Sequence, residues 1–190
     1  MALDVIVGLG NEGGFYRNTR HNIGVHFIDA CRVLIASHQP WRTDAQLHCF
    51  YADVDWCGRR CYLVKPMGFM NESGRGLQLW LSFFKRKSTN MVLCCDDITV
   101  PLGDVKVTFR PGSAGHRGVE DVLSRVGPGF VRFRLGIGPK QHPEMDLKDH
   151  VLGRFSESEQ ACIDGHLSSW VTQLELLLDK KEIPSINPSS

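Results

Sequence analysis

Four short polar segments contain the residues of this chain that could do chemistry. Hydrolysis by an activated water needs a general base, a carboxylate that fixes the base in one tautomer, and an amide that donates to the developing oxyanion. These groups occur in four places: Asn11 with His21, Phe69-Met70-Asn71, Asp96-Asp97, and Gly115-His116-Arg117-Gly118. No Gly-x-Ser-x-Gly elbow or Cys/His signature stands out, so a nucleophile from the protein is not required. These residue types are compatible with hydrolysis by water, but a chain of this length contains several of them by chance, so they do not establish that activity by themselves.

Two of these segments follow expected strands directly. Residues 5–7 form an apolar run that breaks at Gly8 and Gly10, and we expect the glycines of the segment from Gly8 to Gly13 to permit a tight turn. Residues 91–95 are all apolar, as in a central strand that is buried on both faces, and they lead into Asp96. Ligands of α/β sheets bind at the carboxyl ends of strands, which is where we expect these polar segments to converge.

The rest of the chain alternates between helical and strand patterns. Asn71 or Ser73 is placed to cap one helix, and the capping box Ser156-Glu-Ser-Glu159 begins the last one. We expect helices at 22–36, through 77–84, after a glycine-rich loop at 111–118 and from Ser156 onward, and further strands at 46–56, 59–65, 105–109 and 130–137. This alternation predicts an α/β fold around one mixed sheet.

Composition is that of an ordinary globular domain. Of the 190 residues, 42% are hydrophobic and 23% are charged, and no apolar run has transmembrane length. We expect one domain over residues 1–182 and a flexible C-terminal tail over 183–190. The odd number of cysteines, seven, indicates reduced thiols and a cytoplasmic location.

Positive charge is concentrated in one part of the chain, although the net charge is only +1. Residues 105–134 contain two acidic and six basic side chains, the latter being Lys106, Arg110, Arg117, Arg125, Arg132 and Arg134. Such a patch is expected where a phosphate backbone binds, and it is equally typical of a solvated face of mixed charge.

Two short sequence patterns suggest other kinds of site, but the surrounding sequence fits each of these sites poorly. Gly8-Leu-Gly10-Asn-Glu-Gly13 matches a dinucleotide fingerprint, but the helix that should begin within it has no apolar period before Ile23. Three cysteines (Cys49, Cys57, Cys61) and His48 could suggest zinc, but they contain no Cys-x-x-Cys pair and alternate along strand-like segments.

Taken together, the polar segments resemble the bacterial-type peptidyl-tRNA hydrolases. The matching pieces occur in family order over nearly the whole chain: VGLGN at 7–11, Tyr16, TRHNIG at 19–24, KPMGFMNESG at 65–74, DDITVPLG at 96–103, Gly115-His116 with Gly118, RLGIG at 134–138 and VLGRF at 151–155. The resemblance implies a single three-layer α/β/α domain around a mixed, mostly parallel sheet. It also implies a monomer without metal or cofactor and without membrane association. Its expected partner is the acceptor stem and CCA end of peptidyl-tRNA, whose peptide ester it cleaves.

The resemblance also assigns roles to individual residues. His21 falls on the family's catalytic base, and Asp96 falls on the carboxylate that supports it. Asn11 falls on the asparagine of the catalytic centre that engages the peptide. The remaining substrate- and tRNA-binding positions are Tyr16, Phe69, Asn71, His116, Arg117 and Arg134, the last of which falls on half of a clamp for the 5′-phosphate.

Three departures from the family pattern concern substrate contacts. Glu12 stands where a proline is usual, and Arg117 stands where an asparagine is usual. Thr108 occupies the lysine position of the phosphate clamp, for which Lys106 or Arg110 could substitute. The competing interpretation is a non-catalytic RNA-binding relative of the same fold, similar to the organellar intron-splicing factors.

Overall fold

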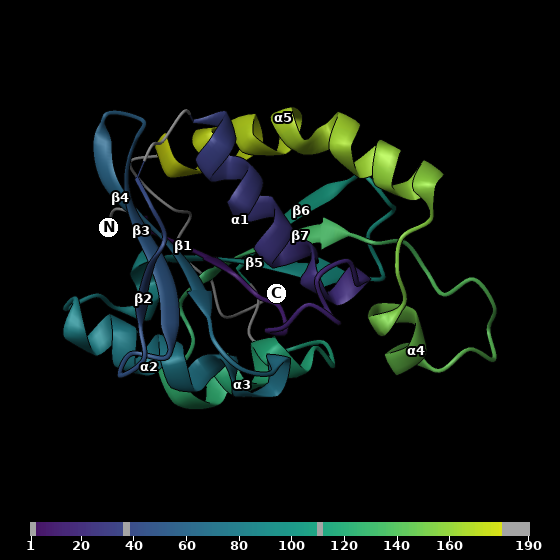
Figure 1. Ribbon diagram of the computed structural model, residues 1–190, viewed down its shortest axis with the longest axis horizontal. Coiled ribbons are helices and arrows are strands. Elements are labelled where there is room, and N and C mark those ends of the chain that lie inside the picture. The colour runs from purple at the N-terminus through teal and green to yellow at the C-terminus, as the bar shows by residue number, and fades with distance from the viewer. Residues whose placement is uncertain (1–2, 36–38, 110–111, 180–190) are drawn as a thin grey trace.

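The computed structural model describes residues 3–35, 39–109 and 112–179. One mixed sheet forms the centre of the molecule (Figure 1). Within these residues the sheet has seven strands in the order β2-β3-β4-β1-β5-β7-β6. Their bounds are β1 Val5–Gly8, β2 Arg42–Asp44, β3 Cys49–Trp56, β4 Arg59–Pro66, β5 Met91–Asp97, β6 Val105–Thr108 and β7 Val131–Gly136.

The four central strands run parallel, and the outer ones are antiparallel to their neighbours. β1 pairs in parallel with both β4 and β5, and β5 pairs in parallel with β7. The pairs β2–β3, β3–β4 and β6–β7 are antiparallel. Every residue of β1 is buried, which explains its uninterrupted apolar sequence. The predicted α/β fold with a mixed sheet is confirmed.

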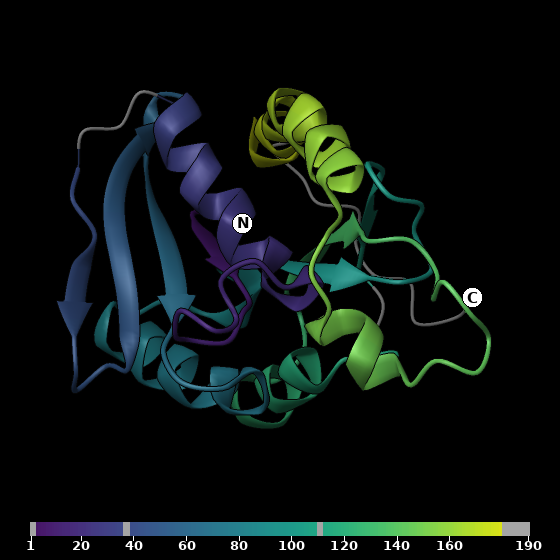
Figure 2. The same ribbon diagram turned by 45° about the vertical axis from the view of Figure 1, so that its right-hand side comes forward.

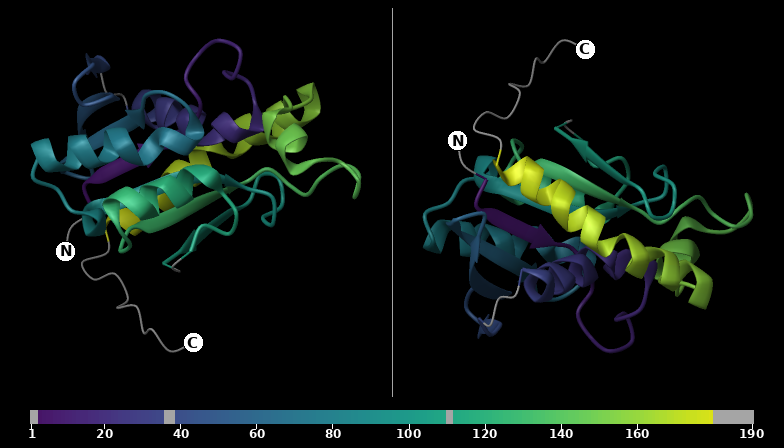
Figure 3. Two further views of the ribbon diagram at one scale, coloured as in Figure 1. Left: turned by 90° about the horizontal axis from the view of Figure 1, so that it is seen from below. Right: turned by 90° about the horizontal axis from the view of Figure 1, so that it is seen from above.

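Two pairs of helices cover the two faces of this sheet (Figures 1 and 3). α1 (Ile23–Leu34) and α5 (Glu157–Asp179) lie on one face, and α2 (Ser73–Phe83) and α3 (Arg117–Val126) lie on the other. Phe27 of α1 stacks on Phe133 of β7 and meets Trp170 of α5 edge to face, whereas Trp80 of α2 belongs to the second core. The molecule therefore has the predicted three layers.

Glycines allow α1 to rest directly on the backbone of the sheet. A Cβ atom on Gly8 would lie 2.4 Å from the carbonyl oxygen of Gly24, and one on Gly24 would lie 2.4 Å from that of Cys94. Of the glycines expected to permit a tight turn, Gly13 does so, with a φ of 107° and a carbonyl that accepts from the Tyr16 N–H. Gly8 instead ends β1, and both it and Gly10 permit the close approach of α1 to this part of the chain.

Some local expectations fail for identifiable reasons. Neither Asn71 nor Ser73 caps α2: the residue before the helix is Glu72, which makes no side-chain cap, and the Ser73 hydroxyl donates to the Met70 carbonyl. The capping box of the last helix is confirmed, since Ser156 N–H donates to the Glu159 carboxylate and Glu159 N–H donates to Ser156 Oγ. Among the α-helices and β-strands of the described residues, β2 and the short helix α4 (Leu147–Leu152) were not predicted.

Parts of the predicted organisation fall outside the described residues. The tail at 183–190 lies outside them, as does Ala36 at the end of the first predicted helix and Arg110 of the basic patch. Among the helices that are described, none is long and apolar enough to cross a membrane.

Candidate active site

His21 and Asp96 meet above the carboxyl ends of the central strands. His21 lies in η1 (Arg20–Asn22), a single 3-10 turn that leads into α1, and Asp96 is the penultimate residue of β5. The Nδ1 atom of His21 lies 2.7 Å from Oδ1 of Asp96. A base and a carboxylate that are 75 residues apart in sequence are thus in direct contact, as the sequence predicted.

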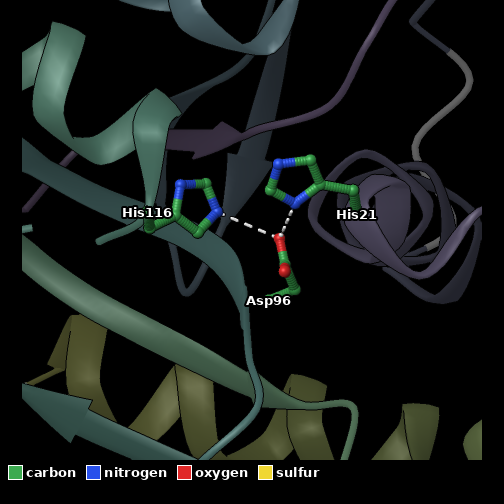
Figure 4. A group of neighbouring side chains, drawn as sticks. All are labelled: His21, Asp96 and His116. Atoms are coloured by element: carbon green, nitrogen blue, oxygen red, sulfur yellow. Dashed lines mark hydrogen bonds and ion pairs between the residues drawn. The ribbon is translucent and has the colours of Figure 1, made fainter. Parts of the chain in front are cut away.

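A second histidine, His116, bonds to the same carboxylate oxygen (Figure 4). Its Nε2 atom lies 3.0 Å from Asp96 Oδ1. Its Nδ1 atom accepts hydrogen bonds from the backbone N–H groups of Gly118 and Val119, at 3.1 and 3.2 Å, and so caps α3. Because Nδ1 is an acceptor, the proton of this imidazole resides on Nε2, which donates to Asp96. His116 therefore lies in one hydrogen-bonded group with His21 and Asp96, in addition to its place in the loop before α3.

The shared carboxylate fixes the tautomer of His21 as well. Asp96 is an acceptor only, so Nδ1 of His21 donates to it and the lone pair of Nε2 stays free. No described residue bonds to that Nε2 atom. The His21 side chain is 13% exposed and that of Asp96 is 4% exposed. The base is accessible, whereas the group that orients it is buried.

Burial and hydrogen bonding act in opposite directions on Asp96. Burial raises the pKa of its carboxyl, but the two imidazoles and their hydrogen bonds lower the pKa by more, to well below the ordinary value of 3.8. Asp96 is therefore ionised at neutral pH, and its charge stabilises an imidazolium formed at His21.

The three side chains also have the composition of a small metal site, with donor atoms within 4.8 Å of one another. A metal ion would need the lone pair of Nε2 of His116. That nitrogen carries the proton, because Nδ1 is already the acceptor of two backbone N–H groups. The donor set fits a hydrogen-bonded chain and does not fit a metal ion.

Asn11 is held rigidly by its neighbours on two loops. Asn22 donates to the Asn11 carbonyl at 2.8 Å and accepts from the Asn11 N–H at 2.9 Å. The side-chain oxygen of Asn11 accepts from the Met70 N–H at 2.8 Å. This assigns the orientation of the amide and leaves its NH₂ group without a partner among the described residues. Asn11 thus presents a fixed donor to the site.

These residues line one cavity of about 390 Å³. Eight of the nine predicted site residues border it: Asn11, Tyr16, His21, Phe69, Asn71, Asp96, His116 and Arg117. The wall that sequence reasoning missed comes from α4, through Leu147, Val151 and Leu152. α4 stands apart from the two helix layers, beside the turn that carries His21 (Figure 2). The cavity joins the predicted catalytic and binding residues into one site.

Comparison with known proteins shows the protein family to which this chain belongs. A family model described as peptidyl-tRNA hydrolase matches residues 5–188. The chain belongs to the peptidyl-tRNA hydrolase family. The peptidyl-tRNA hydrolase of Bartonella quintana is 36% identical over 92% of this chain and 88% of its own, and that of Aquifex aeolicus is 35% identical over 86% and 83%.

Solved structures of peptidyl-tRNA hydrolase agree in fold. The Arg119Gln mutant from Acinetobacter baumannii superposes with a TM-score of 0.86, at 29% identity over 93% of this chain and 89% of that one. A second structure from the same organism gives a TM-score of 0.84 at the same identity, covering 93% and 88%. The three-layer architecture is therefore that of the peptidyl-tRNA hydrolases.

Arg134, the ninth predicted residue, lies outside the cavity. Its Nε donates to Oδ2 of Asp97 at 2.6 Å, and its Nη2 donates to the Thr99 hydroxyl at 2.9 Å. Burial raises the pKa of Asp97, but the hydrogen bonds from Arg134 and Thr99 lower it below its ordinary value. Lys106 is exposed and lies opposite Arg134 in the β6–β7 ladder. Lys106 and Arg134 are therefore a cross-strand pair of basic residues, whereas Arg110, the other candidate for the lysine position, lies outside the described residues.

Glu12, where the peptidyl-tRNA hydrolase pattern has proline, has a structural use. Its N–H donates to the Gly68 carbonyl, and its carboxylate accepts from the Gly68 N–H, both at 2.9 Å. A proline could make neither bond. The loop of Asn11 is thereby joined to the loop that carries Phe69.

Arg117, where the pattern has asparagine, is exposed at the start of α3 and borders the cavity. It has no partner among the described residues. Its guanidinium donors are therefore free for an anionic ligand, whereas the next two backbone N–H groups, those of Gly118 and Val119, already donate to His116.

Arg20, next to His21, fastens this turn to α5. Its side chain is buried, and Nη2 donates to both carboxylate oxygens of Glu159, at 3.0 and 2.8 Å. Its N–H donates to the Gly153 carbonyl, and its guanidinium lies over the ring of Phe155. The turn that carries the base is therefore held from the α4–α5 side.

The two competing site types find no support. The segment after Gly10 continues as a loop until the turn at Arg20, so no helix begins among the glycines where a pyrophosphate would bind. Cys49 and Cys61 are buried, whereas Cys57 is exposed. These cysteines and His48 do not gather into a group with metal-binding distances.

Proposed function

We propose that this chain is a hydrolase of peptidyl-tRNA in which His21 activates the attacking water. The observation that carries the proposal is the single oxygen of Asp96 that accepts from two imidazoles. It leaves Nε2 of His21 as the free base, at the border of a cavity that also contains a fixed amide donor. This is the set of groups that ester hydrolysis by water requires.

The proposed reaction begins when water attacks the carbonyl carbon of the ester between the peptide and the terminal ribose. Nε2 of His21 takes a proton from that water, and Asp96 stabilises the imidazolium that results. The NH₂ group of Asn11 donates to the carbonyl oxygen as it becomes an oxyanion. When the ester C–O bond breaks, the imidazolium returns the proton to the ribose oxygen. The products are a peptide with a free carboxyl group and a reusable tRNA.

We propose that the tRNA contributes its acceptor stem and CCA end. Tyr16 and Phe69 border the cavity as stacking surfaces, and Asn71 supplies an exposed amide without a partner among the described residues. Arg117 and the pair Lys106–Arg134 would hold phosphates. The enzyme would act as a monomer in the cytoplasm and recycle tRNA from aborted translation.

The test is turnover of a tRNA esterified with an N-acetylated amino acid. We expect the wild-type chain to hydrolyse it and His21→Ala to lose about 100- to 10,000-fold in rate, the range of a general base. His142→Ala is the matched control, because His142 is exposed, does not border the cavity and makes no side-chain hydrogen bond to a described residue. Absence of wild-type turnover would favour a non-catalytic RNA-binding relative. Full activity in His21→Ala would contradict the mechanism.

A further inference from the structure

A phenylalanine stands exposed beside the cavity and has no role in the catalytic centre. Phe15 is 76% exposed, the highest value among the large exposed hydrophobic residues of the described chain. A single exposed hydrophobic side chain is ordinary on a protein surface, so what distinguishes Phe15 is its place in a group of aromatic rings at the cavity. Phe15 does not border the cavity itself, although the next residue, Tyr16, does.

Phe15 is the outermost of three aromatic rings in contact. It meets Tyr16 edge to face, with ring centroids 5.2 Å apart, and Tyr16 meets Phe69 edge to face at 6.2 Å. Phe69 is itself 54% exposed. The row therefore leads from the cavity that contains His21 outward to Phe15. Because Phe15 has one ring neighbour and is 76% exposed, most of its surface is free to contact another planar group.

Hydrogen bonds fix the two loops that carry these rings. Gly68 exchanges two bonds with Glu12, and Met70 donates to the side chain of Asn11. On the other side, the Tyr16 N–H donates to Gly13, and the Tyr16 carbonyl accepts from both the N–H and the hydroxyl of Thr19. The aromatic row is therefore preorganised, which lowers the entropy lost when a ligand binds to it.

We propose that Phe15 stacks on an unpaired base of the RNA, one nucleotide away from the esterified terminal nucleoside. The inference rests on the proposed function and names a further part of its substrate. The terminal nucleoside must lie in the cavity, because its ester is next to His21, and Tyr16 and Phe69 border the same space. In this proposal the preceding nucleotide lies at the outer end of the row, where Phe15 is the most exposed of the three rings. Arg17, exposed two residues along the chain, supplies a positive charge near its phosphate.

The experiment compares three substrates that carry the same N-acetylated aminoacyl ester: full tRNA, the trinucleotide CCA, and adenosine alone. Phe15→Ala should raise KM for the tRNA and trinucleotide esters by about 5- to 100-fold, the effect of losing one stacked base, with kcat unchanged. The KM for the adenosine ester should not change, because that substrate has no second base. Phe15→Trp, which restores a stacking surface, should retain wild-type KM values.

Phe83→Ala is the matched control. Phe83 is 66% exposed on α2, contacts one neighbouring ring and does not border the cavity, so its removal should leave all three KM values unchanged. The proposal is overturned if Phe15→Ala behaves like this control. It is also overturned if the adenosine ester loses as much as the trinucleotide, because Phe15 would then only support Tyr16. Wild-type turnover of the tRNA ester tests the proposed function separately.

Discussion

Replacement of Asp96 by asparagine should separate the charge of this residue from its geometry. Both imidazoles donate to the same oxygen, Oδ1, at 2.7 and 3.0 Å. An amide oxygen in that position can accept both bonds, so Asp96→Asn retains the tautomer and the orientation of His21. What disappears is the negative charge that stabilises the imidazolium in the transition state.

The size of that loss follows from Coulomb's law. Opposite charges about 4 Å apart attract by about 1 kcal/mol in water and by about 4 kcal/mol at an effective dielectric constant of about 20. The 4% exposed Asp96 and 13% exposed His21 lie closer to the second case. A loss of about 2 to 4 kcal/mol in the transition state slows hydrolysis about 30- to 1000-fold.

Single-turnover hydrolysis of N-acetylaminoacyl-tRNA at saturating enzyme measures this step without a contribution from binding. Asp97→Asn is the matched control, since Asp97 pairs with Arg134 and does not contact either imidazole. We expect the control to change the single-turnover rate by less than Asp96→Asn does. If Asp97→Asn is the more damaging substitution, or if Asp96→Asn retains the full rate, the assignment of the carboxylate is refuted.

Three further outcomes are expected. Arg117→Asn should weaken the affinity for uncharged tRNA by up to about fivefold, the usual contribution of an exposed charge contact, and should retain or raise kcat. Tighter tRNA binding together with slower turnover would contradict a contact between Arg117 and a phosphate. Glu159→Gln should lower the free energy of unfolding by about 1 to 3 kcal/mol in urea titrations, because buried Arg20 loses its charged partner, whereas exposed Glu157→Gln should have no effect. Burial lowers the pKa of His150 below its ordinary value of 6.5, so the unfolded chain binds this proton more readily than the folded one. The free energy of unfolding should therefore fall as the pH drops below 6.5, by up to about 1.4 kcal/mol per pH unit. His150→Gln should flatten this slope, and an unchanged slope would show that His150 is not the group responsible.

The sequence predicted the central strands well because burial on both faces leaves only apolar residues. β1 and β5 are therefore visible as unbroken runs that end at chemically active positions. β2, by contrast, consists of Arg42, Thr43 and Asp44, which are largely exposed, and its three residues give no apolar alternation. α4 has only six residues, too few for a helical period to emerge. Short or exposed elements are defined by their neighbours in the fold.

The sequence predicted most residues of the candidate site, but it predicted fewer of the contacts between them. His21 and Asp96 were identified together, and the structure places them in contact. The bond from His116 to Asp96 depends on the start of α3, where two backbone N–H groups reach Nδ1. A histidine directly before a helix was the available signal. The position of Arg134 beside Asp97 depends on side-chain directions at two strand ends, which no pattern in the chain specifies.

The contact of α1 with bare backbone has a consequence for how this enzyme can change over evolution. Between Gly24 and the carbonyl of Cys94 there is no room for a side chain. The height of His21 above Asp96 is therefore set by peptide groups, whose size does not vary when sequences diverge. Exchange of hydrophobic residues of different volume elsewhere in the core therefore does not alter the spacing of helix and sheet at this contact. Substitutions at Gly8 and Gly24 are the ones that would change it, because any Cβ atom there meets backbone at 2.4 Å.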